Sequence, residues 1–263
     1  MDAGILDLAV AGTNYLSYHS VKLESDSASL PVLRTNLMAA GIEWLEDFEH
    51  EYSQDELRSF PLLRFGLTSQ AEVRGGPAYG TKFDLSGACE RCGTLARQIS
   101  PLITDTSAIP SEWRFTLTLD REFLVSSEVA DSFRSLTGVE FWEVYALDGT
   151  RSSWLQLIST TSMPPASRAS KGLLQEDPCP KCMRDGWFHS AKEPVAFVYA
   201  KSAVAASLPD VRVTYERFGR STLAQPQTDS HFAPPDLIVV SDVIDVLGDF
   251  IGDGVEFDPV RLV

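Results

Sequence analysis

The chain has 263 residues, of which 44% are apolar and 22% charged, and its formal net charge is -15. This length and apolar content suffice for a buried core, and we expect a single globular unit. A surface with so large a negative charge repels nucleic-acid phosphates and anionic lipids. The composition therefore argues against nucleic-acid binding and membrane-surface roles.

The amino-terminal stretch, residues 1–21, contains two acids and no Lys or Arg, which does not match the basic start of a secretory signal. The longest apolar runs fall short of the ~20 residues that a bilayer crossing needs. We therefore expect a cytoplasmic protein. In that reducing compartment, paired cysteines favour metal binding or redox chemistry over structural disulfides.

The first strongly patterned segment is Leu37–Leu57, where apolar residues recur at helical spacing among acids. This periodicity predicts an amphipathic helix, with Asn36 as its cap. The glycines and proline of Gly75–Gly80 predict a loop. Trp113–Leu119 alternates between apolar and polar residues, as a half-buried strand does.

A hairpin is predicted next, because Val139–Leu147 and Trp154–Ile158 flank the turn-forming pair Asp148-Gly149. Two segments rich in turn residues, Ser159–Ser170 and Ser221–Asp236, are predicted to be loops. Loops of that length usually border a functional site or are mobile.

An internal similarity links Phe123–Asp131 to Leu237–Asp245. Each segment predicts an apolar strand, a serine cap (Ser127 or Ser241) and a short helix, which leads to a strand containing Val-Glu-Phe. The serines are 114 residues apart, the Val-Glu-Phe strands 116 and the cysteine pairs 90. A duplication therefore requires about two dozen inserted residues in the second copy; chance similarity of two capped helices is the alternative.

We predict an α+β fold, with a mixed sheet built from two similar strand-helix-strand units and a zinc-knuckle site made of four cysteines. The single globular unit could consist of two related halves. Residues 1–158 would contain the acidic amino-terminal segment, the first cysteine pair and the first unit. Residues 171–263 would contain the second pair and the second unit.

The four cysteines form two Cys-x-x-Cys pairs, Cys89 with Cys92 and Cys179 with Cys182. This spacing lets both thiolates of a pair face one ion while backbone amides point at the sulfurs, and two such pairs complete a tetrahedral zinc site. The 86 residues between the pairs exceed the gap in compact zinc ribbons. A redox dithiol is the main alternative.

The remaining chemistry is sparse. His189, seven residues after Cys182, could replace a ligand or pack over the knuckle, but packing is the commoner role of a lone histidine. We find no phosphate-binding glycine loop, nucleophile elbow or His-Glu-x-x-His helix. With four protein ligands, zinc would have no position for a water. We therefore predict a structural zinc and no catalytic residues.

Several short motifs in Asp177–Val263 resemble those of a known family. They are, in chain order, Cys179–Cys182, Arg184–Gly186, the strand Pro194–Ala200, Arg217–Gly219, Leu237–Ser241 and Gly254–Val260. With the first cysteine pair, they resemble the double-CxxC(G) motif proteins found mainly in myxobacteria, which are regarded as immunity proteins of polymorphic toxin systems. Two departures are that Cys182 is followed by Met183 instead of glycine, and that an additional acidic segment precedes the first pair.

The resemblance implies a partner, a cognate protein toxin, and the charge is compatible with a basic one. Two acidic runs without any Lys or Arg, Glu43–Glu56 and Asp229–Asp258, are either solvated faces or the docking surface. The candidate contact residues are Glu43, Glu46, Asp47, Glu49, Asp242, Asp245, Asp249 and Asp253. The alternatives to an immunity protein are a thiol-dependent oxidoreductase and a regulatory zinc protein with another partner.

Overall fold

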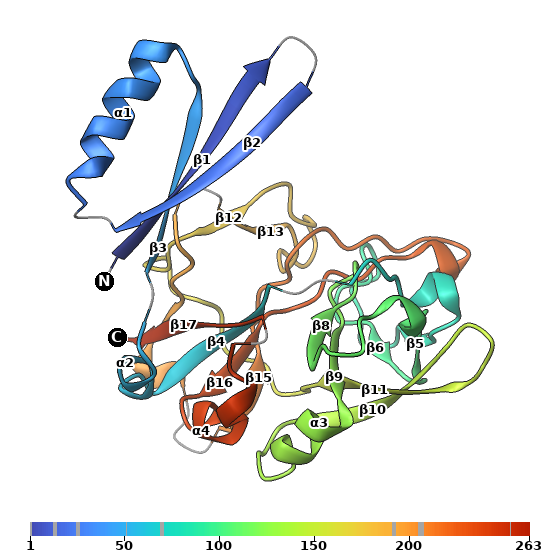
Figure 1. The fold of residues 1–263 in the computed structure, drawn as a ribbon. Helices are drawn as coiled ribbons and strands as arrows, with labels where there is room; N and C mark the ends of the chain where they lie inside the picture. Colours follow the sequence, from blue (N-terminus) through green and yellow to red (C-terminus); the bar gives the residue numbers. More distant parts are fainter. Residues whose placement is uncertain are drawn as a thin grey trace.

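Of the sheets in the described residues, the two with the most strands have five each (Figure 1). The computed structural model describes residues 2–12, 15–24, 27–50, 52–68, 71–190, 193–204, 208–252 and 254–263. Helices occur together with sheets that contain both parallel and antiparallel pairs, which confirms the predicted α+β class.

The first five-stranded sheet has the order β7-β10-β11-β9-β8. Its strands are β7 (Leu102–Ile103), β8 (Phe115–Leu117), β9 (Phe123–Ser126), β10 (Glu140–Tyr145) and β11 (Arg151–Ile158). Strands β10 and β11 pair antiparallel, and Gly149 in the connecting turn has the positive φ of 84° that favours glycine. The predicted hairpin is therefore confirmed.

The second five-stranded sheet has the order β14-β17-β4-β16-β15. Its strands are β4 (Leu62–Leu67), β14 (Val198–Tyr199), β15 (Val211–Val213), β16 (Leu237–Val240) and β17 (Val255–Leu262). Its central strand β4 precedes the first cysteine pair, whereas the other four follow the second pair. The segments 1–158 and 171–263 are therefore interleaved within one sheet.

The two five-stranded sheets have the same sequence of parallel and antiparallel pairings from one edge to the other. In each, one edge strand is parallel to its neighbour (β7 to β10, β14 to β17) and every other pairing is antiparallel. In the central pairings, Phe141 of β10 faces Leu157 of β11, and Phe257 of β17 faces Phe65 of β4. Helices α3 (Ser127–Phe133) and α4 (Val243–Leu247) follow the equivalent strands β9 and β16.

The main core lies where the two sheets and their helices meet. It joins Phe65 and Leu237 of the second sheet with Phe115 and Leu157 of the first. Helices α3 and α4 pack against each other there, and Phe133 is 1% exposed. The two sheets consequently share one apolar core, and apolar burial holds them together.

The amino-terminal part forms a three-stranded sheet of its own, in the order β2-β1-β3. Its elements are β1 (Asp2–Gly12), β2 (Tyr15–Glu24), α1 (Ser29–Ala40) and β3 (Trp44–His50). Leu30 and Leu37 of α1 are buried in a small apolar cluster next to Trp44. Figure 1 shows this sheet and α1 at one end of the molecule.

The predicted helix Leu37–Leu57 is wrong. Helix α1 ends at Gly41, which takes a left-handed conformation with a φ of 65° and closes the last turn. The chain then forms β3, which pairs with β1, and α2 spans only Gln54–Arg58. Asn36 lies inside α1 instead of capping a helix. Pairing with a distant strand outweighs the local helical periodicity here.

Two further predictions need correction. The strand within Trp113–Leu119 is only Phe115–Leu117, and it is buried on both faces instead of half-buried. Its polar residue Thr116 is buried with its hydroxyl satisfied, since that hydroxyl accepts a bond from the amide of Ala71. The cap of α3 is Ser126 rather than Ser127, and α4 begins without a side-chain cap bond, at Asp242 instead of Ser241.

The remaining elements are short. They are strands β5 (Phe83–Asp84), β6 (Arg97–Gln98), β12 (Leu173–Gln175) and β13 (Trp187–His189), and the 3-10 turns η1 (Pro77–Tyr79), η2 (Thr106–Ala108), η3 (Lys201–Ala203), η4 (Gln227–Asp229) and η5 (Gly248–Phe250). The two segments predicted as loops, Ser159–Ser170 and Ser221–Asp236, contain the turn η4 and isolated β-bridges. Among their residues there is no α-helix and no longer strand, so the loop prediction is confirmed. Among the described residues, no helix has the length and apolar character required to cross a bilayer.

Candidate metal centre

Each cysteine pair lies between the two strands of a small antiparallel sheet. Cys89 and Cys92 follow β5 and precede β6, and Cys179 and Cys182 follow β12 and precede β13. These two-stranded sheets are distant in sequence but present their connecting turns to each other. Each knuckle thus forms the turn of a hairpin, and the two hairpins are built in the same way.

The first knuckle is closed by a bond from the amide of Gly93 to the carbonyl of Cys89, at 2.7 Å. Gly93 has a φ of 80°, and a Cβ there would stand 2.5 Å from the ring of Phe232. Both the backbone conformation and the close approach of Phe232 therefore require glycine.

The second knuckle has the same closure, from the amide of Met183 to the carbonyl of Cys179 at 2.9 Å. Met183 takes the left-handed conformation with a φ of 55°, as Gly93 does, and its side chain is 52% exposed. The missing glycine after Cys182 hence leaves the knuckle geometry intact, since an exposed side chain meets no clash there.

The carboxylate of Asp185 binds the backbone of the second knuckle. It accepts the amide of Cys179 at 2.8 Å and the amide of Ser221 at 3.1 Å, and the residue is 3% exposed. Gly186 follows with a φ of 76°, where a Cβ would stand 2.6 Å from the carbonyl oxygen of Glu176. The Arg184–Gly186 motif therefore has a structural role beside the cysteines.

The four sulfurs converge. The Sγ atoms of Cys89 and Cys179 are 3.9 Å apart, those of Cys92 and Cys182 are 3.6 Å apart, and all four lie within 4.8 Å of one another. We call this group the cysteine cluster. It confirms that the distant pairs come together, and four thiols at these distances could hold one metal ion.

The surroundings of the cysteine cluster favour unequal protonation of the thiols. Burial acts to raise the pKa of Cys89, but bonds from the amides of Cys92 and Arg91 outweigh it and lower that pKa to about 7. Burial raises the pKa of Cys92 to about 12. A cation among the sulfurs would favour thiolates at all four positions. Lys181 beside them is ion-paired with Glu90, so part of its charge is already balanced.

His189 is not part of the cysteine cluster. Its Nε2 lies 2.8 Å from a carboxylate oxygen of Asp236, and its ring packs on Phe218 with 4.5 Å between the centroids. The packing role expected of a lone histidine thus holds for His189, and it binds a carboxylate rather than a metal.

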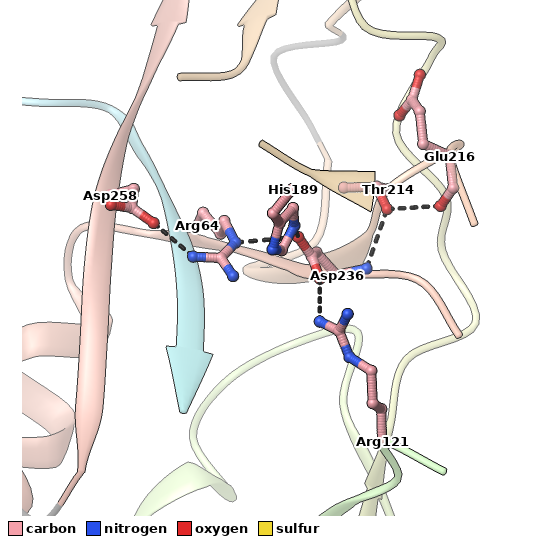
Figure 2. Close-up of polar contacts among 7 residues, drawn as sticks. All are labelled: Arg64, Arg121, His189, Thr214, Glu216, Asp236 and Asp258. Atoms are coloured by element: carbon pink, nitrogen blue, oxygen red, sulfur yellow. Dashed lines mark hydrogen bonds and ion pairs between the residues drawn. The ribbon is translucent and has the colours of Figure 1, made fainter. Parts of the chain in front are cut away.

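Asp236 is the centre of a polar network that the sequence reading missed. Figure 2 shows its side chain between those of Arg64, Arg121 and His189. The guanidinium groups lie 2.9 Å and 3.1 Å from the carboxylate, and Arg64 also binds Asp258 at 2.5 Å. In sequence, Asp236 is one acid in a run without bases, and the three side chains that bind its carboxylate are at least 47 residues away. No local signal pointed to this Asp236 network.

The acids predicted to bind a partner fall into separate places. Glu43 is exposed between α1 and β3, and so are Asp242, which directly precedes α4, Asp245 of α4 and Asp249 of η5. The side chains of Glu46, Asp47 and Glu49, which belong to β3, and all of Asp253 lie outside the described residues.

Two of these acidic segments do meet. Arg58 of α2 binds Asp55 at 3.1 Å and Asp245 of α4 at 2.9 Å. The carboxyl end of the first acidic run thus lies beside the second. We call the exposed acids of this region, Asp55, Asp242, Asp245 and Asp249, the acidic face.

Comparison with protein-family models finds no match, and comparison with curated proteins finds no similar sequence. The residues and their geometry therefore carry the functional argument.

Proposed function

We propose that this is an immunity protein of the cytoplasm, which binds a cognate basic toxin through the acidic face and is stabilised by one zinc ion in the cysteine cluster. The observation that carries the binding role is the row of exposed acids on α4 beside α2. The toxin as partner is implied by the resemblance of the cysteine and tail motifs to double-CxxC(G) immunity proteins.

Zinc is the ion that suits four thiols at these distances. With Zn–S bonds of about 2.3 Å, a tetrahedral site separates its sulfurs by about 3.8 Å. Two of the four sulfur separations between the knuckles, 3.6 Å and 3.9 Å, are close to that value. Because protein would fill all four positions, no site remains for a reacting water, and the proposed ion is structural.

Not every acid of the second run is available to a partner. Asp236 is 2% exposed and Asp258 binds Arg64, so these two serve the Asp236 network. Asp242, Asp245 and Asp249 remain exposed. A concentrated negative field of this kind accelerates the encounter with a basic protein and disfavours acidic ones.

One observation favours the alternative of a dithiol oxidoreductase. Cys89 is partly exposed and its pKa is lowered to about 7, which are properties of a reactive thiol. An oxidoreductase would label rapidly at Cys89 with a thiol reagent while retaining any metal. A zinc ligand would label slowly until a chelator is added.

The equivalent positions of the two sheets also support a proposal about origin. We propose that β9-α3-β10 and β16-α4-β17 belong to two related units, each of which includes one knuckle hairpin. In the first unit, β4 would precede the first knuckle, and in the second unit, β11 would precede the second knuckle. Each of these strands is the central strand of a five-stranded sheet. Each unit's first strand would then be inserted into the sheet of the other unit.

The test of the immunity role is protection of cells that express a candidate toxin whose gene neighbours that of this protein. We expect the wild-type protein to restore growth, and the double variant Asp242→Lys/Asp249→Lys to lose protection. Two charge reversals on the docking surface should weaken binding at least about tenfold, mainly through the association rate, and increased salt should weaken wild-type binding similarly. Binding is measured by surface plasmon resonance.

The matched control is Glu72→Lys/Glu112→Lys, which makes the same charge change at two exposed acids outside the acidic face. It should protect as the wild type does. Failure of the wild-type protein to protect would rule out the immunity role, and full protection by the Asp242/Asp249 variant would rule out the acidic face as the contact.

A further inference from the structure

A cavity of about 840 Å³ lies among segments that include residues shortly after each knuckle. Its walls come from the segment after the first knuckle, from the end of β11 and from the predicted loop Ser221–Asp236. Arg184, two residues after Cys182, and Arg217 complete it. Its volume falls in the range of small-molecule sites in proteins, about 300–1,000 Å³. The immunity role assigns no task to this cavity.

The charge of its walls is unusual for so acidic a protein. Five arginines line the cavity, Arg74, Arg97, Arg121, Arg184 and Arg217, together with three acids, Asp120, Glu122 and Asp229. Burial raises the pKa of Glu122 to about 7, so one of those acids is partly neutral near neutral pH. The chain as a whole has 22 basic and 37 acidic residues. A concentration of arginines in this chain therefore requires a local explanation.

Some of these arginines already have carboxylate partners. Arg121 binds Asp236 in the Asp236 network, and Arg97 lies 3.5 Å from Asp84. Arg184 and Arg217 have no carboxylate within 4.0 Å among the residues that the structure describes. They thus lack a described carboxylate at ion-pair distance and are only partly exposed, although the buried carboxyl of Glu216 interacts electrostatically with both.

The guanidinium of Arg184 is held in place. Its Nε and Nη2 atoms donate to the carbonyl of Tyr215 at 3.3 Å and 3.1 Å, and it stacks over the ring of Tyr215 at 3.8 Å. This arrangement fixes the planar group without neutralising it, so its charge stays available to a ligand.

Arg217 has an unsatisfied buried donor. Its Nε is buried and has no hydrogen-bond partner in the part of the chain described here. Burial, and then the nearby charge of Arg184, lower the pKa of Arg217 to about 10, against the opposite effect of Glu216. Two guanidinium groups that repel each other and are partly desolvated are costly unless an anion binds between them.

The cavity also offers an apolar surface. The rings of Phe83 and Phe232 pack with centroids 4.9 Å apart, and Phe123, Leu157 and Leu237 contribute further apolar lining. A bare inorganic ion would leave this surface unused, whereas an anion with a planar apolar group would cover it.

We infer that this cavity binds a small organic anion, whose phosphate or carboxylate lies between Arg184 and Arg217 and whose planar apolar part lies against the aromatic wall. Bidentate pairing with a guanidinium suits both kinds of anion. Both arginines come from the short motifs Arg184–Gly186 and Arg217–Gly219, so the cavity gives these motifs a binding role besides support of the knuckle.

The experiment uses the full chain with its metal and three probes of similar size. Phenyl phosphate and benzoate are the two anions, and benzamide is their uncharged counterpart. Binding is followed by calorimetry and by the NMR resonance of the Arg217 Nε–H, which burial should make observable. We expect at least one anion to bind at least tenfold more tightly than benzamide and to shift that resonance.

The variants Arg217→Gln and Arg184→Gln should each weaken binding of that anion at least about tenfold. Arg217→Lys retains the charge without the fork of donors and should weaken it less. The control Arg134→Gln, at an exposed arginine paired with Asp131, should leave binding unchanged. Melting temperature and metal content verify that each variant is folded.

The comparison of phosphate with carboxylate identifies the anion class, and either preference supports the inference. Equal affinity of the wild-type protein for benzamide and both anions would overturn it. So would anion affinity that persists in the folded Arg217→Gln and Arg184→Gln variants. Neither result depends on the toxin, so this inference and the immunity role can fail separately.

Discussion

Asp236 shows what a single side chain does in this fold. Burial acts to raise the pKa of Asp236, but its contacts with Arg64, His189 and Arg121 outweigh that effect and hold the pKa below its ordinary value of 3.8. The carboxylate therefore stays ionised in the interior and joins β4, β13 and the segment before β9 to the start of β16 (Figure 2).

We predict that Asp236→Asn destabilises the protein by about 3–5 kcal/mol, because it leaves the buried guanidinium of Arg64 with Asp258 as its remaining carboxylate. Since the native pKa is depressed, the wild-type contribution is complete above about pH 4 and is lost as the pH falls below that value. Urea unfolding at pH 7 and at lower pH measures both effects. The exposed control Asp242→Asn should change stability by less than about 0.5 kcal/mol; an equal effect of the two variants would contradict the prediction.

At the scale of elements, the two knuckles differ in how much they depend on glycine. Gly93 combines a left-handed conformation with the close approach of Phe232, whereas Met183 has the same backbone region and an exposed side chain. Of the two positions, only 93 combines both constraints, so glycine is needed there and dispensable at 183.

We therefore predict that Gly93→Ala costs about 2–4 kcal/mol, from backbone strain and the clash with Phe232 together. Met183→Gly should instead be neutral or stabilise by up to about 1 kcal/mol, because relief of the left-handed strain is partly offset by the greater freedom of the unfolded chain. Thermal unfolding of the two metal-loaded variants provides the comparison. Equal losses at both positions would show that the knuckles are more alike than the geometry indicates.

The sequence predicted elements best where the signal is local. The hairpin around Asp148-Gly149 and the turns of the Cys-x-x-Cys pairs depend on neighbouring residues, and both formed as expected. The helix over Leu37–Leu57 failed because the fate of Trp44–His50 depends on its pairing with β1. The Asp236 network was equally inaccessible, since its members come from five separate segments.

At the scale of the whole molecule, an ion in the cysteine cluster would act as a cross-link. It would join positions 90 residues apart, and the segment between them contains the first five-stranded sheet. A zinc ion there would restrict the unfolded chain as a disulfide across the same loop does, on the order of 4 kcal/mol by loop-closure entropy.

We predict one zinc per chain in freshly purified protein, by atomic emission of metal and sulfur. Removal of zinc with a chelator should lower the melting temperature, and each of four Cys→Ser variants should lose the metal and the same stability. Ser86→Ala, close to the first knuckle but outside the cysteine cluster, is the control. Loss of zinc from variants of one pair alone would contradict a shared ion.

The position of β4 in the middle of the second sheet has a consequence for how the polypeptide could be divided. A cut within Ser159–Ser170 would give one fragment that retains β4 and another that lacks it, although β4 is the middle of the second fragment's sheet. The first fragment would keep all five strands of the first sheet but leave β4 without its partners, and the second would lack the middle of its sheet, so the two fragments would have to reassociate to regain the second sheet. A gene split at this point would therefore encode an obligate heterodimer.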